Sequence, residues 1–432
     1  MRERHKNFLT FLVALVLSYT ALEFAVWRPF LEEVPLTLHT TLGRLQYLAQ
    51  TSKADVIPKD YTLIIGDSLA EGLGDQLLQV IHERKPKYNT AHYLHDATGR
   101  DVLTFGVRGG YPSDTYVFNT YRNWGGINVY AGIELDQPKD VVVLYSGATD
   151  INDEMTNINF WLPKNFDRTR LKDPKYIAEH MAARAEVGRK AAKRRWHVFR
   201  NAHMLDTITK LTKLLYKNVK KGADVLLTDE DPAFRVGKAY VPNWSRHKGS
   251  PVKIRVGGET KTYPQNTVEA LAFHSAEEIE QASLFFDASL VELKKLFPQS
   301  RLWVVYTPTP INAYHLESPT VMLRDRIRFA DTEKAGPLTE FSAQHLARQS
   351  DRICRRIRAG TLASGGRFID SRPHLRDVSS RIGYVHGPND AGHFNKRGYT
   401  ALSEIIRRGM KDGAFDTCAN LAAPGGDGAG RQ

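Results

Sequence analysis

The sequence predicts an α/β protein built on a mostly parallel five-stranded sheet with helices on both faces. Helical spacing fills most of the intervals between the expected strands, notably over residues 276–297 and again after Gly398. Strands that alternate with helices, and that are apolar on both faces, are typical of parallel sheets. The expected strands are short runs rich in β-branched and aromatic residues, at 61–65, 102–105, 140–145, 301–306 and 367–370.

The composition is that of a globular protein with a sizeable core. Of 432 residues, 42% are hydrophobic and 25% are charged, which excludes global disorder and collagen-like repeats. The two cysteines, Cys354 and Cys418, are not part of a C-x-x-C pair, so zinc ribbons, iron–sulfur clusters and a disulfide-rich scaffold are excluded. A single bridge between them and two free thiols both stay open.

The net charge of +12 is confined to one part of the chain. Residues 164–221 hold 17 basic and 5 acidic residues, while the rest of the chain is balanced, with 43 of each sign. A nucleic-acid-binding domain usually carries its positive charge over the whole binding surface. We therefore expect no nucleic-acid partner.

Residues 1–30 are expected to form an uncleaved membrane anchor. Residues 7–22 carry no charge, follow basic residues, and precede Trp27, which suits the membrane interface. A cleaved signal peptide is the alternative, but no good small-x-small cleavage site follows the apolar run. The positive-inside bias predicts a single-pass protein of the inner membrane, with a cytoplasmic N-terminus and a periplasmic domain in a Gram-negative cell. Residues 31–57 are interpreted as a linker.

The main domain, 58–418, is expected to be interrupted by an insertion at 156–275, because the interval between the third and fourth strands is too long for an ordinary crossover. Its first half is expected to form two basic helices. The second of these, 204–221, has apolar and lysine residues on opposite faces, so it either packs as a solvated cap or contacts anionic lipid or an acidic polymer. Residues 234–263 are expected to form a β-ribbon lid, and 419–432 a disordered tail.

Residues that suit nucleophilic catalysis follow the first expected strand and precede the last helix. Ser68 lies at a strand-to-helix turn, where it is either a nucleophile or, like Asp67, a helix N-cap. Asp390 precedes His393 by three residues, so its carboxylate can orient the histidine as a base within one loop. Because the carboxyl ends of parallel strands meet at one edge, these segments should converge there. Two further polar turns end at the same edge, at 106–110 and 146–150.

These segments resemble the sequence blocks of the SGNH, or GDSL, hydrolase superfamily. The first block is matched by GDSLAEG at 66–72 and the last by DAGHFNKRGY at 390–399. The two middle blocks are fitted by TFGVRGGYPSDT at 104–115 and SGATD at 146–150. The resemblance covers the sheet-forming segments, 58–150 and 300–412, and says nothing about the insertion. It implies a three-layer, flavodoxin-like fold.

The resemblance also implies a catalytic mechanism. It assigns Ser68 as the nucleophile, His393 as the base and Asp390 as the partner that orients the base. It places two oxyanion donors at the backbone N–H groups of Ser68 and Gly109. The triad requires no metal, and no H-E-x-x-H sequence occurs, so we expect no metal and no other cofactor.

One position departs from the family pattern. The family's third oxyanion donor is an asparagine, and here that position is Thr149, whose hydroxyl reaches less far than an amide; Asn152 is the rival donor. The departure leaves reduced hydrolysis, a changed acyl preference and binding without turnover as alternatives. Ser113, Ser146 and Asp153 are weaker candidates for the pocket, because polar residues at strand ends commonly form turns. Candidates for stacking on sugar rings, or for core packing, are Tyr111, Trp124, Trp161, Trp196 and Trp244.

The expected function is that of a membrane-anchored serine esterase that acts through an acyl-enzyme. Its substrate class follows from the resemblance and the expected location: O-acyl esters of a carbohydrate or lipid, in particular an envelope or secreted polysaccharide. One alternative is a polysaccharide O-acetyltransferase, in which a sugar hydroxyl instead of water intercepts the acyl-enzyme. The other is a polysaccharide-binding protein without catalytic activity.

Overall fold

The computed structural model describes residues 2–81, 83–130, 133–147, 149–193, 208–209, 212–213, 252–263, 270–324, 338–388, 390 and 392–422. At its centre is a five-stranded parallel sheet with the strand order β2-β1-β3-β6-β10. The α/β class and all five predicted strands are confirmed, the strands to within one residue at either end. The strands are β1 (Thr62–Gly66), β2 (Val102–Gly106), β3 (Asp140–Ser146), β6 (Arg301–Thr307) and β10 (Arg367–Asp370).

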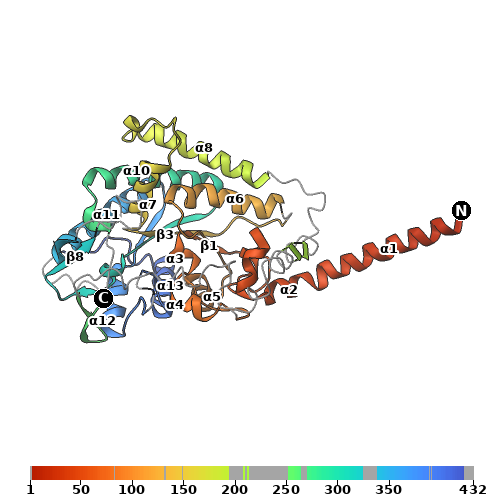
Figure 1. Cartoon of the computed structure of the whole chain (residues 1–432), viewed down its shortest axis with the longest axis horizontal. Helices are drawn as coiled ribbons and strands as arrows, with labels where there is room; N and C mark the ends of the chain where they lie inside the picture. The colour runs from red at the N-terminus through yellow and green to blue at the C-terminus, as the bar shows by residue number, and fades with distance from the viewer. Residues whose placement is uncertain are drawn as a thin grey trace.

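The sheet is buried between two apolar cores. Along β1, Leu63 and Ile65 belong to one core and Ile64 to the other, as expected for side chains that alternate between faces. The first core is closed by α6 (Thr120–Gly125), α8 (Pro174–Lys193), α10 (Ala276–Leu296) and α11 (Ala343–Ala363). The second is closed by α5 (Thr90–Thr98), α12 (Arg372–Arg381) and α13 (Lys396–Asp412). In Figure 1, α10 and α6 lie above the strands and α5 and α13 below them.

Local sequence sets the ends of the long helices. At the start of α10, the Ser275 hydroxyl accepts from the Glu278 N–H at 3.2 Å, and the Glu278 carboxylate accepts from the Ser275 N–H at 2.7 Å. At the start of α13, the Asn395 side chain accepts from the Gly398 N–H. Gly413 ends α13 in the left-handed conformation, with φ 65°. These caps are local signals, which is why both helices are predictable from sequence.

The N-terminal helix α1 (Arg2–Ala25) is exposed, and its segment His5–Glu23 is long and apolar enough to cross a membrane. Two further segments, α2 (Trp27–Glu33) and η1 (Leu36–Ala49), follow it. Residues 31–57, interpreted from the sequence as a linker, contribute buried side chains to the first core. These side chains are buried because the apolar residues of α2 and η1 pack against the main domain. These side chains include Leu31, Val34, Leu48 and Val56.

The interval between β3 and β6 begins with helices, contains a hairpin and ends with α10. β4 (Lys253–Val256) and β5 (Glu259–Thr262) pair antiparallel, and β7 (His315–Leu316) joins β4 to make a second small sheet. β8 (Thr320–Arg324) pairs with β9 (Leu338–Ser342). The short helical segments of the chain are α3 (Ser68–Glu71), α4 (Asp75–Gln79), η2 (Asp114–Asn119), η3 (Gly126–Tyr130), α7 (Thr149–Thr156), η4 (Asn157–Trp161), η5 (Arg168–Arg170), η8 (Ala270–Phe273) and η9 (Pro310–Ala313).

Two predicted features fall largely outside the described residues. Of the basic helix predicted at 204–221, the structure describes only 208–209 and 212–213, which are helical. Of the β-ribbon predicted at 234–263, it describes 252–263, and this part does form the β4–β5 hairpin. Residues 423–432 of the predicted disordered tail also lie outside the described part.

Candidate active site

Ser68 lies where the first strand turns into a helix. β1 ends at Gly66 and α3 begins at Ser68. The cap of α3 is Asp67, whose Oδ1 accepts from the Leu69 N–H at 2.8 Å. Of the two residues that the sequence offers as caps, the structure therefore uses Asp67. The Ser68 hydroxyl is engaged elsewhere.

The Ser68 hydroxyl faces the loop before the last helix. Ser68 Oγ lies 2.9 Å from His393 Nε2, and His393 Nδ1 lies 2.7 Å from Asp390 Oδ2. Asp390 is held in turn, because its Oδ1 accepts from the Gly392 N–H at 3.0 Å and its own N–H donates to Asp75 Oδ1 at 2.8 Å. Ser68 thus forms one line of hydrogen bonds with His393 and Asp390, although His393 lies 325 positions further along the chain.

The charges in this line strengthen His393 as a base, because they stabilise its protonated form. Burial raises the pKa of Asp390, but its hydrogen bond and attraction to His393 outweigh this, so the pKa of Asp390 is lowered. The ionised carboxylate accepts from His393 Nδ1–H, which leaves Nε2 as the acceptor for the Ser68 hydroxyl. Burial lowers the pKa of His393, yet the hydrogen bond and charge of Asp390 raise it above its ordinary value. Smaller contributions come from Asp67 and Glu71.

Gly109 lies in the turn that follows β2, at the same edge of the sheet. Its φ is +63°, in the left-handed region that favours glycine, and a side chain added there would meet no atom within 4 Å. Glycine is therefore favoured at this position by the backbone conformation and not by a lack of space for a side chain. Thr149 begins α7 directly after β3 and is exposed. Asn152 is half-buried on the same helix, with its Nδ2 3.4 Å from Asp153 Oδ1.

An ion pair that the sequence analysis missed joins the Gly109 turn to the Ser68 helix. Arg108 Nε donates to both oxygens of Glu71, at 3.0 and 3.1 Å, and Nη2 donates to Glu71 Oε1 as well. The end of β2 lies directly against α3, since a Cβ on Gly106 would lie 2.1 Å from the Glu71 nitrogen. Glu71 lies three residues after Ser68, on the helix that Ser68 begins, and Arg108 immediately precedes Gly109. The sequence indicates this pair only in that each partner lies close to a predicted site residue.

Buried carboxyl groups lie behind the site, and the sequence analysis did not identify them as a group. Asp150 accepts from the Tyr116 hydroxyl and the Ser146 N–H, each at 2.7 Å. Burial, with the charge of Asp67, raises the pKa of Asp150 well above its ordinary value. Burial likewise raises the pKa of Asp153 to about 7, again with a contribution from Asp67.

Glu154 is held by the start of η2. It accepts from the Ser113 N–H at 2.9 Å, from Ser113 Oγ at 3.0 Å and from Asn157 Nδ2 at 2.9 Å. Burial raises the pKa of Glu154 to about 7. Ser113 and Ser146, weak candidates for the pocket, are both buried, and their bonds to carboxylates give them a structural role. The sequence does indicate that these carboxyl groups lie together, because the spacing of Asp150, Asp153 and Glu154 places them on one face of a helix.

The aromatic candidates that the structure describes, Tyr111, Trp124 and Trp161, have different surroundings. Trp124 packs edge-on against Phe297, with ring centroids 5.5 Å apart, and belongs to the core. Trp161 ends η4 with 64% of its surface exposed, and Tyr111 is half-buried. Trp196 and Trp244 lie outside the described residues.

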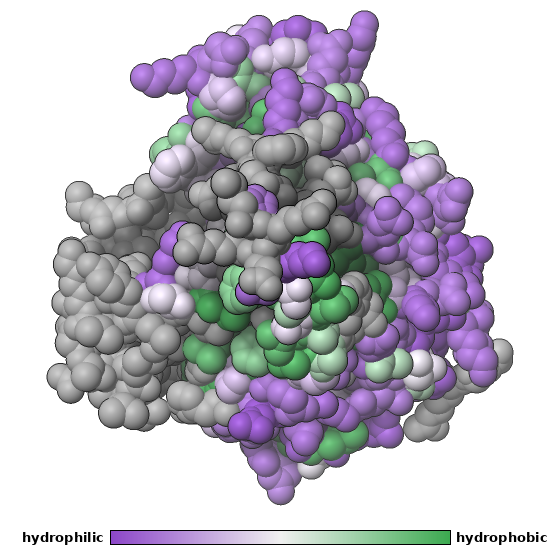
Figure 2. Space-filling model, turned by 90° about the vertical axis from the view of Figure 1, so that its right-hand side faces the viewer, coloured by the Kyte–Doolittle hydropathy of each residue, from purple (hydrophilic) through white to green (hydrophobic). Residues whose placement is uncertain are grey.

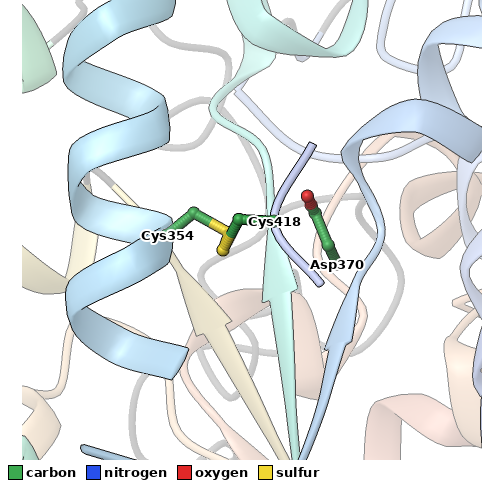
Figure 3. A group of neighbouring side chains, drawn as sticks. All are labelled: Cys354, Asp370 and Cys418. Carbon is green, nitrogen blue, oxygen red and sulfur yellow. A yellow bond between two sulfur atoms is a disulfide. The ribbon is translucent and has the colours of Figure 1, made fainter. Parts of the chain in front are cut away.

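The two cysteines are bonded to each other. Cys354 of α11 and Cys418 form a disulfide that closes a separation of 64 residues (Figure 3). Asp370 lies close enough for the three side chains to be considered as metal ligands. However, bonded sulfurs are not thiolates, and Asp370 is engaged by Arg372, whose Nε and Nη2 each donate at 2.8 Å. This trio is therefore a structural clamp on the C-terminal segment.

The arrangement as a whole provides a hydroxyl, a histidine base, a carboxylate that orients it and backbone N–H groups at one edge of the sheet. These are the parts that acyl transfer to a serine needs. Comparison of the chain with protein-family models, with curated proteins and with solved structures gives no match.

Proposed function

We propose that the protein is a serine ester hydrolase of the SGNH, or GDSL, type, with a three-layer flavodoxin-like fold interrupted by the insertion at 156–275. The observation that carries the proposal is the hydrogen-bonded line from Ser68 Oγ through His393 to Asp390. The strand order β2-β1-β3-β6-β10 supports the fold assignment, because it is the flavodoxin-like order 2-1-3-4-5 when the five strands are numbered along the chain.

The reaction begins with attack by Ser68 Oγ on the ester carbonyl carbon, while the hydroxyl proton passes to His393 Nε2. The carbonyl oxygen gains negative charge and accepts from the backbone N–H groups of Ser68 and Gly109. The resulting imidazolium is stabilised by Asp390. It returns its proton to the leaving alcohol as the ester bond breaks, which leaves an acyl group on Ser68. Water then attacks this acyl-enzyme by the same steps and releases the carboxylic acid.

The third oxyanion donor is assigned to the Thr149 hydroxyl. Thr149 is exposed at the first residue of α7, at the carboxyl end of the central strand β3. Asn152 is the rival, but its Nδ2 is directed at Asp153 and would have to turn away to reach a substrate. Because a hydroxyl has a shorter reach than an amide, we expect the oxyanion site to be weaker than one with asparagine.

The proposed substrate is an O-acyl ester of an envelope or secreted carbohydrate, and the proposed location is the outer side of the inner membrane. The apolar segment of α1 supports an anchor, and the basic residues at the start of the same helix support a cytoplasmic N-terminus. The Cys354–Cys418 disulfide is in keeping with an oxidising compartment such as the periplasm.

Acyl transfer to a sugar hydroxyl is the second candidate, and Thr149 is the observation that favours it. An oxyanion site weakened for attack by water suits an enzyme whose acceptor is positioned by other contacts. Both reactions proceed through the same acylated Ser68, so only the product separates them. A polysaccharide-binding protein without turnover would form no acyl-enzyme.

The test uses the full-length protein in mild detergent with p-nitrophenyl acetate and with an acetylated polysaccharide. We expect acyl release, labelling of Ser68 by a fluorophosphonate, and a loss of about 10⁴-fold or more in Ser68→Ala. Ser380→Ala, in α12, is the control and should keep full activity. A folded Ser68→Ala protein with undiminished activity, or absence of labelling in the wild type, would exclude the mechanism. Acetyl transfer to an added oligosaccharide that exceeds hydrolysis would identify the transferase.

A further inference from the structure

A basic cavity lies at the amino-terminal edge of the sheet, opposite the proposed active site. It has a volume of about 350 Å³ and is bordered by the starts of β1 and β6 and by the ends of α5 and α13. Four cationic side chains line it, and no acidic residue does. The cations are Arg100, Arg301, Arg407 and Lys411, and the remaining lining residues are Thr62, Leu94, Ala97, Thr98 and Met410.

Two of the cations, Arg100 and Arg301, are paired with one buried carboxylate. Asp140 is fully buried and accepts from Arg100 Nη1 at 2.9 Å and from Arg301 Nε and Nη2 at 2.7 and 2.8 Å. Trp303 Nε1 donates to the same carboxylate at 2.9 Å. A single negative charge thus holds two guanidinium groups, and both keep exposed surface, 34% for Arg100 and 43% for Arg301. The pair carries more positive charge than Asp140 neutralises.

The outer wall of the cavity belongs to the last two turns of α13. Arg407 pairs with Glu404, at 2.7 Å, and this carboxylate lies outside the lining. Lys411 is exposed and makes no ion pair within the described part of the chain. The cavity therefore keeps an excess of positive charge after Asp140 and Glu404 are counted. Guanidinium groups bind phosphate and carboxylate oxygens in a fork geometry, so the expected ligand is an anion.

The cavity opens at the edge of the domain to which the N-terminal helix is joined. The Val102 N–H at the start of β2 donates to the Ser52 carbonyl, and Trp27 of α2 belongs to the first core. The last part of the chain between α1 and the sheet therefore lies at the amino-terminal edge, and Gln50 before it bonds along β2, to Thr104. In Figure 1, α1 leaves the domain from this side. Seen from the same side, apolar residues gather near the centre of the face and hydrophilic residues surround them (Figure 2).

We propose that this cavity binds the anionic headgroup of a membrane glycerophospholipid. If α1 crosses the bilayer, the amino-terminal edge faces the headgroups, and a positively charged cavity there meets anionic lipid. Two arginines held by Asp140 present preset donors to the phosphate, while Arg407 and Lys411 close over it. The contact would hold the proposed active site, at the opposite edge of the sheet, away from the membrane and toward soluble polymer.

The test measures lipid binding to the full-length protein in neutral detergent by native mass spectrometry. The probes are phosphatidylglycerol, phosphatidylcholine, inorganic phosphate and an acidic oligosaccharide. Arg407→Gln/Lys411→Gln removes two charges without exposing Asp140. The matched control is Arg381→Gln/Lys175→Gln, because Arg381 pairs with Asp377 within one helix, as Arg407 does with Glu404. If the double variant does not fold, the exposed charge reversal Lys411→Glu replaces it.

We expect phosphatidylglycerol to bind in preference to phosphatidylcholine, and the double variant to bind it roughly twentyfold more weakly. The control variant should bind as the wild type does. Equal retention of the two lipids, or phosphatidylglycerol binding unchanged in the cavity variants, would overturn the proposal. So would phosphate or the oligosaccharide binding as tightly as the lipid, because the cavity would then serve a soluble anion. None of these outcomes depends on whether Ser68 is catalytic.

Discussion

The Glu71 carboxylate accepts from Arg108 through both Nε and Nη2, and this pair links the helix that begins at Ser68 to the turn that holds Gly109. Both side chains are about three-quarters buried, with 26% and 28% of their surfaces exposed. The two oxyanion donors proposed here come from these two segments. We therefore expect this ion pair to set their separation, with Glu71 and Arg108 as positioning residues.

The first prediction is that the two partners move the pH profile in opposite directions. Hydrolysis needs neutral His393, so kcat/KM falls as the pH drops through a pKa that lies above the ordinary histidine value. Glu71 contributes to that elevation, so Glu71→Gln should shift the acid limb to lower pH. Arg108→Gln leaves Glu71 unpaired and should shift it to higher pH.

Both variants should also lower kcat, roughly tenfold to a hundredfold, because Gly109 is held less firmly. Arg108→Lys retains the charge without the fork, so it should keep the wild-type pH limb while losing part of kcat. The measurement is the pH profile of kcat and kcat/KM for each variant and the wild type, with p-nitrophenyl acetate as substrate. Shifts in the same direction, or no shift in either variant, would reduce the pair to a structural role.

The second prediction concerns Thr149. Removing an oxyanion donor typically costs about 3 to 4 kcal/mol, or a hundredfold to a thousandfold in rate. Thr149→Val keeps the shape and removes the hydroxyl, so it should slow ester hydrolysis, whereas Thr149→Asn should speed it. In a transferase, Thr149→Asn should raise hydrolysis more than transfer. If Thr149→Val has full activity and Asn152→Ala loses it, the donor is Asn152.

The third prediction is that α1 stays attached and anchors the protein. The full-length chain should remain in the membrane pellet after alkaline carbonate washing, and mass spectrometry should find its N-terminal residues. Cleavage before Trp27 would leave the buried side chains of α2 in place, so a processed protein would still fold. Recovery of soluble protein that begins after residue 20 would therefore establish a secreted enzyme.

The fourth prediction concerns the disulfide. Closing 64 residues restricts the unfolded chain, so the double variant Cys354→Ala/Cys418→Ala should lose about 4 kcal/mol of unfolding free energy. Urea titration of protein made in an oxidising compartment measures the loss. Dithiothreitol is the matched control, because it should destabilise the wild type to a similar extent and leave the double variant unchanged. Equal stability of the two oxidised proteins would show that the clamp is dispensable.

Much of the fold was predictable because its signals are local. The strands are continuous apolar runs, and the ends of α10 and α13 are marked by Ser275, Glu278 and Asn395 within one turn of each boundary. The convergence of Ser68 with His393 was also predictable, since parallel strands bring their carboxyl ends to one edge. This prediction needs only a parallel sheet, and it does not give the distance between the two side chains.

By itself, then, the sequence determined the class of sheet, the limits of its strands and the residues that meet at its carboxyl edge. Only the tertiary structure decided which of Asp67 and Ser68 caps α3, that Glu71 pairs with Arg108, and that residues 31–57 join the core. It alone placed two arginines on Asp140. The cap is a local bond, but Ser68 is drawn from it by the distant His393. The other contacts join segments that are distant in the chain, so no local pattern encodes them, because they depend on the order of the strands and on which side chains become buried together.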